Sequence, residues 1–319
     1  MDIRELHAEE LLNPVGIKPS GVDLLIGGPP CQGFSLANQS NKTQDNPNNQ
    51  LTRDFIRLTA EIRPRWFVME NVIGLIKMKK GEVQDKIIKA FKKYGYNVTV
   101  CVLKASDYGV PQERERVFFI GNRMGKTFII SPKTLISTRN CFITVKQAIW
   151  DLPNLYGGAG RDLMEYDDSK TPEPGTYAYI MRNGAKKLLN HRATQNGSVV
   201  LERYKYIKQG ENWSSIPKQL MGRQEKTTQE KRKKVYHSNL YRRLKENEPS
   251  ITIVNFRKSM IIHPWEDRGL TVREAARLQS FFDTYRFLGS LGAQQQQVAN
   301  AVPPLLAKAV AVQIMKELL

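Results

Sequence analysis

The stretch that decides the fold is Asp23-Leu24-Leu25-Ile26-Gly27-Gly28-Pro29-Pro30-Cys31-Gln32-Gly33-Phe34-Ser35. Its apolar first half has no polar alternation, which predicts a buried parallel strand over residues 22–28. The strand ends at two glycines, and the two prolines that follow fix φ and stiffen the turn. The turn presents the thiol of Cys31 at the carboxyl end of the strand, the edge of an open α/β sheet where ligands bind. A lone cysteine is more often buried and structural, so the downstream sequence must decide its role.

Strands and helices alternate after this stretch. A polar, Asn- and Gln-rich segment over 36–50 predicts a loop, and apolar spacing over 51–62 predicts a helix that Pro64 ends. Further elements are expected in the order strand, helix, strand, strand, at residues 66–69, 82–94, 97–103 and 117–120. This alternation predicts an α/β fold with a doubly wound, mostly parallel sheet.

The alternation is lost in the second half of the chain. Residues 150–260 are rich in Gly, Asn, Pro and Lys and show no sustained period. Their basic run at 231–234 is typical either of a solvated face or of a contact with a DNA backbone. Regularity returns over 270–279, where Thr271 begins a capping box, and a final helix is expected over 305–319.

The composition limits the function. Forty-nine Lys and Arg residues against 31 Asp and Glu give a formal net charge of +18. This excess favours a polyanionic partner, most often nucleic acid, although a soluble basic protein could carry the same charge. The three cysteines are far apart and the four histidines lack ligand spacing, so neither a disulfide framework nor a metal site is expected. No apolar run approaches membrane-spanning length, and no signal peptide is recognisable.

Five motifs, in order, resemble those of the cytosine-5 DNA methyltransferase family of the bacterial and phage restriction–modification type. They are Gly-Gly-Pro-Pro-Cys-Gln-Gly-Phe-Ser at 27–35, Glu-Asn-Val at 70–72, Gln-Glu-Arg-Glu-Arg at 112–116, Arg-Gly-Leu-Thr-Val-Arg-Glu-Ala-Ala-Arg-Leu-Gln-Ser-Phe at 268–281, and Asn-Ala-Val-Pro-Pro at 300–304. Any one of them could arise by chance, but together they span almost the whole chain.

The resemblance implies a function and a domain order. The function is transfer of a methyl group from S-adenosylmethionine to carbon 5 of cytosine in a specific double-stranded DNA sequence, without a metal. The order is a Rossmann-like catalytic domain at 1–150, a small irregular target-recognition region at 151–262, and a return to the catalytic domain at 263–319. A cytoplasmic, nucleoid-associated protein is expected.

The resemblance also assigns the catalytic residues. Carbon 5 of cytosine is a poor nucleophile, so a thiolate must first add at carbon 6, and Cys31 matches the family's thiol. Glu70 matches the acid at ring nitrogen 3, with a pKa raised in a dry pocket. Arg116 matches the arginine that contacts the base, with Arg114 in support, and Asn71 matches the asparagine that orders the thiol-bearing loop. Taken alone, each charged residue would instead indicate a surface ion pair. The target base is inaccessible inside a duplex, so base flipping is implied.

The opening of the chain departs from the family pattern. The family begins with a strand, a Phe-x-Gly-x-Gly-Gly loop and an acidic residue that ends the next strand, and the sequence has neither feature. The residues that match the family's donor contacts are Asp2, Ile3, Gly28, Pro30, Leu51, Asn300 and Val302. We therefore expect two βα units, each of about 30 residues, to be missing at the N-terminus. The strand at 22–28 would then be an exposed edge. The chain is expected to be either one half of a split methyltransferase, whose partner polypeptide supplies the opening strands, or an N-terminally truncated product without independent activity.

Two other functions fit the same motifs. The first is methylation of cytosine in transfer RNA on the same fold, although Gly33-Phe34-Ser35 resembles the DNA branch more. The second is an inactive or regulatory DNA-binding subunit. The missing donor loop favours that interpretation, whereas the complete set of Cys31, Glu70 and the two arginines argues against it.

Overall fold

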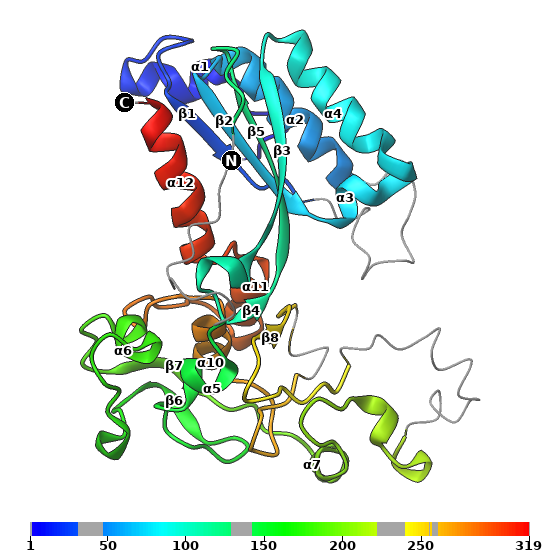
Figure 1. Ribbon diagram of the computed structural model, residues 1–319, viewed down its shortest axis with the longest axis vertical. Helices are drawn as coiled ribbons and strands as arrows, with labels where there is room; N and C mark the ends of the chain where they lie inside the picture. The colour runs from blue at the N-terminus through cyan, green and yellow to red at the C-terminus, as the bar shows by residue number, and fades with distance from the viewer. Residues whose placement is uncertain are drawn as a thin grey trace. The chain divides into compact units, whose positions relative to one another are not determined.

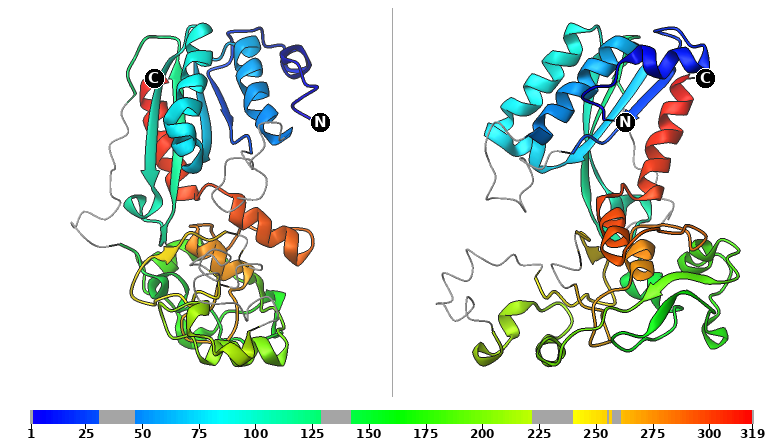
Figure 2. Two further views of the ribbon diagram at one scale, coloured as in Figure 1. Left: turned by 90° about the vertical axis from the view of Figure 1, so that its right-hand side faces the viewer. Right: turned by 180° about the vertical axis from the view of Figure 1, so that it is seen from behind.

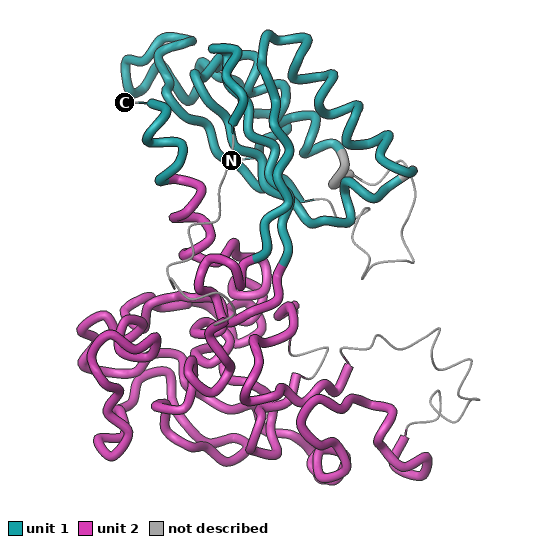
Figure 3. The backbone as a smooth tube through the Cα atoms, in the orientation of Figure 1, with its two compact units in different colours: residues 1–104, 115–132, 312–319 teal, residues 105–114, 133–311 magenta. Residues whose placement is uncertain are grey.

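The computed structural model describes residues 2–30, 47–128, 142–221, 240–254, 256 and 261–318, without the side chains of 47–49 and 79. The chain divides into two compact units, which Figure 3 colours separately. Unit 1 consists of Met1–Lys104, Glu115–Pro132 and Val312–Leu319, and unit 2 of Ala105–Arg114 and Lys133–Ala311.

Unit 1 contains a four-stranded sheet with helices packed on it (Figure 1). Its strands are β1 (Leu24–Gly27), β2 (Trp66–Val72), β3 (Asn97–Lys104) and β5 (Glu115–Asn122). Its helices are α1 (Ala8–Leu12), α2 (Pro47–Ile62), α3 (Gly74–Lys77), α4 (Glu82–Lys93) and the end of α12 (Pro304–Leu318). The strands and longer helices expected from the sequence are therefore present, with ends that differ by a few residues. The expected loop over 36–50 lies mostly outside the described residues, and α2 begins within it.

The strand order is β1-β2-β5-β3, and the sheet is mixed. The β1–β2 pair is parallel, whereas β5 runs antiparallel to both β2 and β3. β1, β2 and β3 therefore run in one direction, and among the described strands β5 is the exception to the predicted mostly parallel sheet. The physical reason is the short link between β3 and β5, which carries only the 3₁₀ turn Ala105–Tyr108 and the two-residue strand β4 (Gln112–Glu113). A parallel pair would need a crossover of about a dozen residues or more, usually a helix.

An aromatic core holds α2 and α4 on one face of the sheet, where Figures 1 and 2 show the two helices side by side. Phe67 of β2 stacks on Phe91 of α4 with ring centroids 4.0 Å apart, and Phe55 of α2 meets Phe67 edge to face. A Cβ atom at Gly27 would lie 2.5 Å from the Phe55 ring. The first glycine of the Gly-Gly pair is thus required for β1 to pack against α2.

Strand β1 is less buried than its apolar sequence predicts. Among the described residues it pairs with β2 alone, so it forms one end of the sheet. Its side chains are half-buried, and Ile26 is 70% exposed. The expectation of a buried strand is wrong for Ile26, while the expected parallel direction is confirmed by the pairing with β2.

Unit 2 is built from short elements around one buried helix. Its helices are α5 (Val145–Ile149), α6 (Tyr177–Arg182), α7 (Ser198–Lys205), α10 (Val272–Leu278) and α11 (Leu291–Asn300), followed by the start of α12. Its strands are β4, β6 (Gly160–Met164), β7 (Leu188–Arg192) and β8 (Ser250–Ile251). β4 pairs with β8 in parallel, and β6 pairs with β7 antiparallel.

Helix α10 is the centre of unit 2. Every one of its residues is buried, and the apolar ones pack among side chains of α5, α6 and β7. The predicted capping box is confirmed, because the Thr271 hydroxyl accepts from the Glu274 backbone N–H and the Glu274 carboxylate accepts from that of Thr271. This packing explains why 263–311 belongs to unit 2, whereas the sequence suggested a return to the catalytic domain over 263–319.

Within the described ranges, no single helix is long and apolar enough to cross a membrane. The bent pair of α11 and α12 satisfies the criterion only when the two helices are taken together.

Candidate active site

Asn71 holds the segment that leads to the predicted nucleophile. Cys31 itself lies outside the described residues. The side-chain amide of Asn71 donates to the Pro29 carbonyl at 3.0 Å, and its oxygen accepts from the Val72 N–H at 2.9 Å. Asn71 is buried at the end of β2, so both ends of its amide are fixed. The side chain therefore anchors the backbone two residues before Cys31, where the sequence placed a loop-ordering asparagine.

Glu70 and Arg116 form an ion pair between neighbouring strands. β2 and β5 are antiparallel here, and Arg116 Nε lies 2.8 Å from Glu70 Oε1. A Cβ atom at Gly28 would lie 3.1 Å from Glu70 Oε2. One oxygen of this carboxylate thus faces the arginine and the other faces the backbone at the end of β1. Both side chains are largely buried, with 11% of Arg116 and 18% of Glu70 exposed.

The electrostatics of this pair are dominated by burial. Burial lowers the pKa of Arg116 below its usual value, and the adjacent Glu70 carboxylate only partly opposes this effect. The guanidinium still carries its charge at any physiological pH, because arginine is not deprotonated in proteins. An arginine this close favours the charged form of a carboxylate, which opposes the protonated acid that the sequence suggested for Glu70.

Arg114 has a different environment from Arg116. It is fully buried in unit 2, where it donates to the carbonyls of Ile253, Ala299 and Ala301 at 2.8–3.0 Å. Two of these carbonyls flank Asn300, a predicted donor contact. These bonds make Arg114 an anchor of the backbone around Asn300. The match to the family motif suggested only a supporting role for Arg114 and did not reveal these backbone partners.

The predicted donor contacts at the start of the chain are tied down by two arginines. The Asp2 carboxylate accepts from Arg4 Nε at 3.0 and 3.1 Å, and the Arg4 guanidinium lowers the pKa of Asp2 to about 2. The Ile3 carbonyl accepts from Arg57 Nη2 at 2.9 Å. Sequence reasoning missed Arg57. Its i,i+4 spacing to Glu61, which it meets at 2.9 Å, was the available signal for an ordered side chain.

The remaining donor candidates fall in both units. Gly28 and Pro30 are exposed after β1, and Leu51 is partly buried in α2. Asn300 and Val302 belong to unit 2. The exposed glycine offers backbone to a ligand, but the Asp2 carboxylate is already engaged by Arg4. These residues fit only part of an S-adenosylmethionine site, which agrees with the absence of the glycine-rich loop from the sequence.

Comparisons with known proteins give one consistent result. A sequence profile described as C-5 cytosine-specific DNA methylase matches residues 1–316. Type II methyltransferase M.DdeI of Desulfomicrobium norvegicum is 37% identical over 313 residues, which cover 93% of this chain and 74% of the relative. Type II methyltransferase M1.HphI of Haemophilus parahaemolyticus is 36% identical over 317 residues, covering 99% and 73%.

Solved structures of methyltransferases are also similar to this chain. A prophage-encoded protein of E. coli, described as a DNA modification methyltransferase, superposes with a TM-score of 0.72 at 26% identity, covering all of this chain and 85% of that one. The Dnmt2 methyltransferase of S. pombe, at 16% identity, superposes with a TM-score of 0.52, covering all of this chain and 84% of that one. The latter likeness concerns the fold alone.

Proposed function

The chain belongs to the C-5 cytosine-specific DNA methylase family, and from this premise we propose that it methylates carbon 5 of cytosine in duplex DNA through a covalent adduct with Cys31. The observation that carries the proposal is the Glu70 carboxylate, which lies between Arg116 and the Gly28 backbone. Asn71 fixes the same segment from the side. An acid, a cation and an anchored backbone segment therefore meet at Gly28 and Pro29, which immediately precede Pro30 and Cys31 in the sequence.

Cys31 supplies the nucleophile. Its thiolate adds to carbon 6 of cytosine, so a sulfur–carbon bond forms and the ring electrons move toward nitrogen 3 and carbon 5. S-adenosylmethionine, when bound, supplies an electrophilic methyl group on a sulfonium. After carbon 5 is methylated, a base removes its proton and the thiolate leaves, which restores the aromatic ring.

Glu70 and Arg116 stabilise the charge that develops on the ring. Thiolate addition makes nitrogen 3 more basic, so a proton shared between nitrogen 3 and the Glu70 carboxylate becomes favourable once the adduct forms. Arg116 Nη2 makes no hydrogen bond to any described residue and can donate to the base. A fixed cation of this kind stabilises developing negative charge without reorganising.

The rest of the chain suits a DNA substrate. The net charge of +18 favours the phosphate backbone. Unit 2, which contains the region assigned to target recognition, would hold the duplex while the target cytosine turns out of the stack. Since the proposed substrate is DNA, we place the enzyme in the cytoplasm with the nucleoid.

The donor site needs additional strands, and the unpaired edge of β1 is where they could pair. β1 has no second strand partner among the described residues, and Ile26 is 70% exposed on it. We propose that additional strands pair along this edge and bring the glycine-rich donor loop. They would come either from a longer form of the chain or from a second polypeptide.

Exchange of the hydrogen at carbon 5 tests the proposal without a donor. Thiolate addition labilises that hydrogen, so the 319-residue chain should release tritium from DNA that contains 5-tritiated cytosine. It should also be trapped on duplexes that contain 5-fluorocytosine when the donor and the complementing strands are added. The Cys31→Ser protein should do neither, and tritium release by that variant equal to the wild type would refute the adduct.

Methyl transfer separates the remaining alternatives. We expect transfer only when the complementing strands are supplied, and transfer by the chain alone would overturn the open-edge proposal while leaving the adduct intact. The donor loop absent from the sequence favours one second function, a regulatory DNA-binding subunit. DNA binding with neither tritium release nor trapping would support that function instead.

A further inference from the structure

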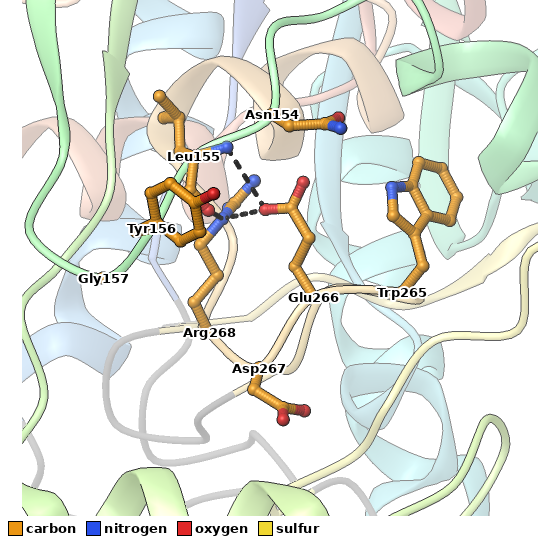
Figure 4. A pocket seen from close by; sticks show the side chains of 8 residues that line it. All are labelled: Asn154, Leu155, Tyr156, Gly157, Trp265, Glu266, Asp267 and Arg268. Carbon is orange, nitrogen blue, oxygen red and sulfur yellow. Dashed lines mark hydrogen bonds and ion pairs between the residues drawn. The ribbon is translucent and has the colours of Figure 1, made fainter.

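Unit 2 contains a cavity that the proposed chemistry does not use. Its volume is about 400 Å³, within the range of small-molecule sites. The side chains that matter are Asn154, Tyr156, Trp265, Glu266, Asp267 and Arg268 (Figure 4). They come from two separate loops, one after α5 and one before α10.

The floor of the cavity is a carboxylate with spare accepting capacity. Glu266 Oε2 accepts from the Leu155 N–H at 3.4 Å and from Arg268 Nε. Glu266 Oε1 receives no hydrogen bond from the described part of the chain, and Figure 4 shows it directed toward the space between Asn154 and Trp265. Asn154 has its own carbonyl oxygen occupied by Lys170 Nζ at 2.7 Å. The amide nitrogen of Asn154 is therefore the group left to face a ligand.

The charges in the cavity are already compensated. Glu266 pairs with the buried Arg268, which also pairs with Glu274 at 2.7 Å. Asp267 pairs with Arg243. A ligand would thus meet a hydrogen-bond acceptor rather than an excess of negative charge. A cation would gain little from paired carboxylates, and a phosphate would gain little from arginines that already have carboxylate partners.

Two exposed aromatic rings flank this acceptor. Tyr156 is 88% exposed and Trp265 is 38% exposed, and in Figure 4 they lie on either side of Glu266. Large aromatic side chains held this far into solvent cost hydrophobic free energy unless they cover something. In proteins that bind nucleic acid, such rings are stacking platforms for unpaired bases.

We propose that this cavity binds one unstacked nucleobase that carries an exocyclic amino group. The amino group donates to Glu266 Oε1, the Asn154 amide donates to a ring nitrogen, and the base stacks on Tyr156, the more exposed of the two rings. A carboxylate that accepts from an exocyclic amine is a known means of base discrimination. The proposal rests on the proposed function only in that the chain binds DNA; the base bound here is separate from the cytosine that meets Cys31.

Single-stranded probes test the cavity without any catalytic step. We would measure the affinity of the 319-residue Cys31→Ser protein for a short oligothymidylate with one central deoxyadenosine. The matched probe carries deoxyinosine, which lacks the amino group. Loss of one base-specific contact predicts about tenfold weaker binding of the inosine probe. Adenine also keeps the probe away from the cytosine pocket, and failure of methyl transfer would leave this result unaffected.

Two variants assign the effect to the cavity. Tyr156→Ala should weaken binding of the adenosine probe by about tenfold, whereas Tyr179→Ala, which removes a ring 49% exposed on α6, should not. Glu266→Gln should abolish the preference for adenosine over inosine. If Glu266→Gln does not fold, because Arg268 loses a partner, the comparison of Tyr156→Ala with Tyr179→Ala still tests whether the probe binds in the cavity.

Three results would overturn the proposal. The first is equal affinity of the Cys31→Ser protein for the two probes, and the second is unchanged binding by Tyr156→Ala. The third is Tyr156-dependent binding of a short arginine peptide with no adenosine preference, which would assign the cavity to a cationic side chain of a partner protein.

Discussion

Two arginine–carboxylate clusters, one in each unit, show how similar residue types serve different ends. In unit 1, Arg116 meets one carboxylate, Glu70, at 2.8 Å. In unit 2, Arg277 meets two, Asp151 and Asp283, at 3.1 and 2.6 Å. All three residues of the unit 2 cluster are fully buried, whereas both residues of the unit 1 pair remain partly exposed.

The two arginines also differ in the balance between burial and charge. Burial alone lowers the pKa of each. Two carboxylates more than offset that effect for Arg277 and raise its pKa, whereas one carboxylate does not offset it for Arg116. Arg277 also donates to the Ala148 carbonyl, so all of its nitrogens have partners. A saturated cluster stabilises a fold, and an unsaturated one can bind a ligand.

The comparison predicts the largest effect for Glu70. Replacing it by glutamine (Glu70→Gln) keeps the shape but removes the charge beside Arg116, so the adduct loses the group that shares the nitrogen 3 proton. We expect tritium release from carbon 5 of cytosine to fall by about 10³-fold. Because the pair is largely buried, losing the charge also costs stability, so tritium release is compared at a temperature at which circular dichroism shows the variant to be folded.

A neighbouring acid provides the control for this prediction. Glu115→Gln alters an exposed carboxylate at the start of the same strand as Arg116 and should leave tritium release within about twofold of the wild type. If Glu70→Gln exchanged tritium at the rate of Glu115→Gln, the unit 1 pair would be structural, and the contrast with unit 2 would disappear.

The unit 2 cluster should show the reverse behaviour. Arg277→Met removes the cation that Asp151 and Asp283 share and leaves them only Arg182 and Arg273, respectively, as arginine partners. Losing the shared partner of two fully buried carboxylates should cost about 3 kcal/mol of unfolding free energy. Urea unfolding followed by tryptophan fluorescence measures this loss. Lys205→Met, which breaks an exposed pair with Glu202, should leave the unfolding free energy nearly unchanged. Equal losses of unfolding free energy in Arg277→Met and Lys205→Met would show that the burial of the Arg277 cluster adds nothing to its contribution to stability.

The sequence predicted what depends on local pattern. The order of strands and helices in unit 1 followed from apolar spacing, and the capping box at Thr271 followed from residue types three positions apart. Glu70, Asn71 and Arg116 were chosen because they match family motifs, and the structure brings these three to the end of β1 and β2. Short-range sequence patterns and family motifs were therefore enough to predict these three residues of the candidate site.

What the sequence missed depends on tertiary partners. The reversed direction of β5 follows from the short link between β3 and β5. Arg114 bonds to carbonyls 139 to 187 residues away, which no local pattern encodes. The cavity beside Glu266 likewise joins two loops that are more than 100 residues apart in sequence.

The smallest effect concerns the histidines buried beside the unit 2 network. Burial lowers the pKa of His263 to about 3, helped by Arg268 and Arg243 and opposed by Glu274, and burial also lowers the pKa of His191. The unfolded chain therefore binds more protons than the folded one below about pH 6.5. The stability from each neutral histidine is complete above that pH and is lost as the pH falls.

Between about pH 7.5 and pH 5.5, each such histidine should cost about 1 kcal/mol of unfolding free energy. Glu274 and Asp283 do not contribute in this window, because their lowered pKa values move their titration to more acid pH. Burial raises the pKa of Glu266, and its contribution is shared by the wild type and the histidine variants, so it cancels in their comparison. His263→Gln should reduce the pH dependence of urea unfolding by one histidine's share. His7→Gln should leave it unchanged, since the His7 side chain is 67% exposed. Because only a histidine that is neutral when folded gives this slope, an unchanged slope in His263→Gln would mean that His263 already carries its proton beside Glu274.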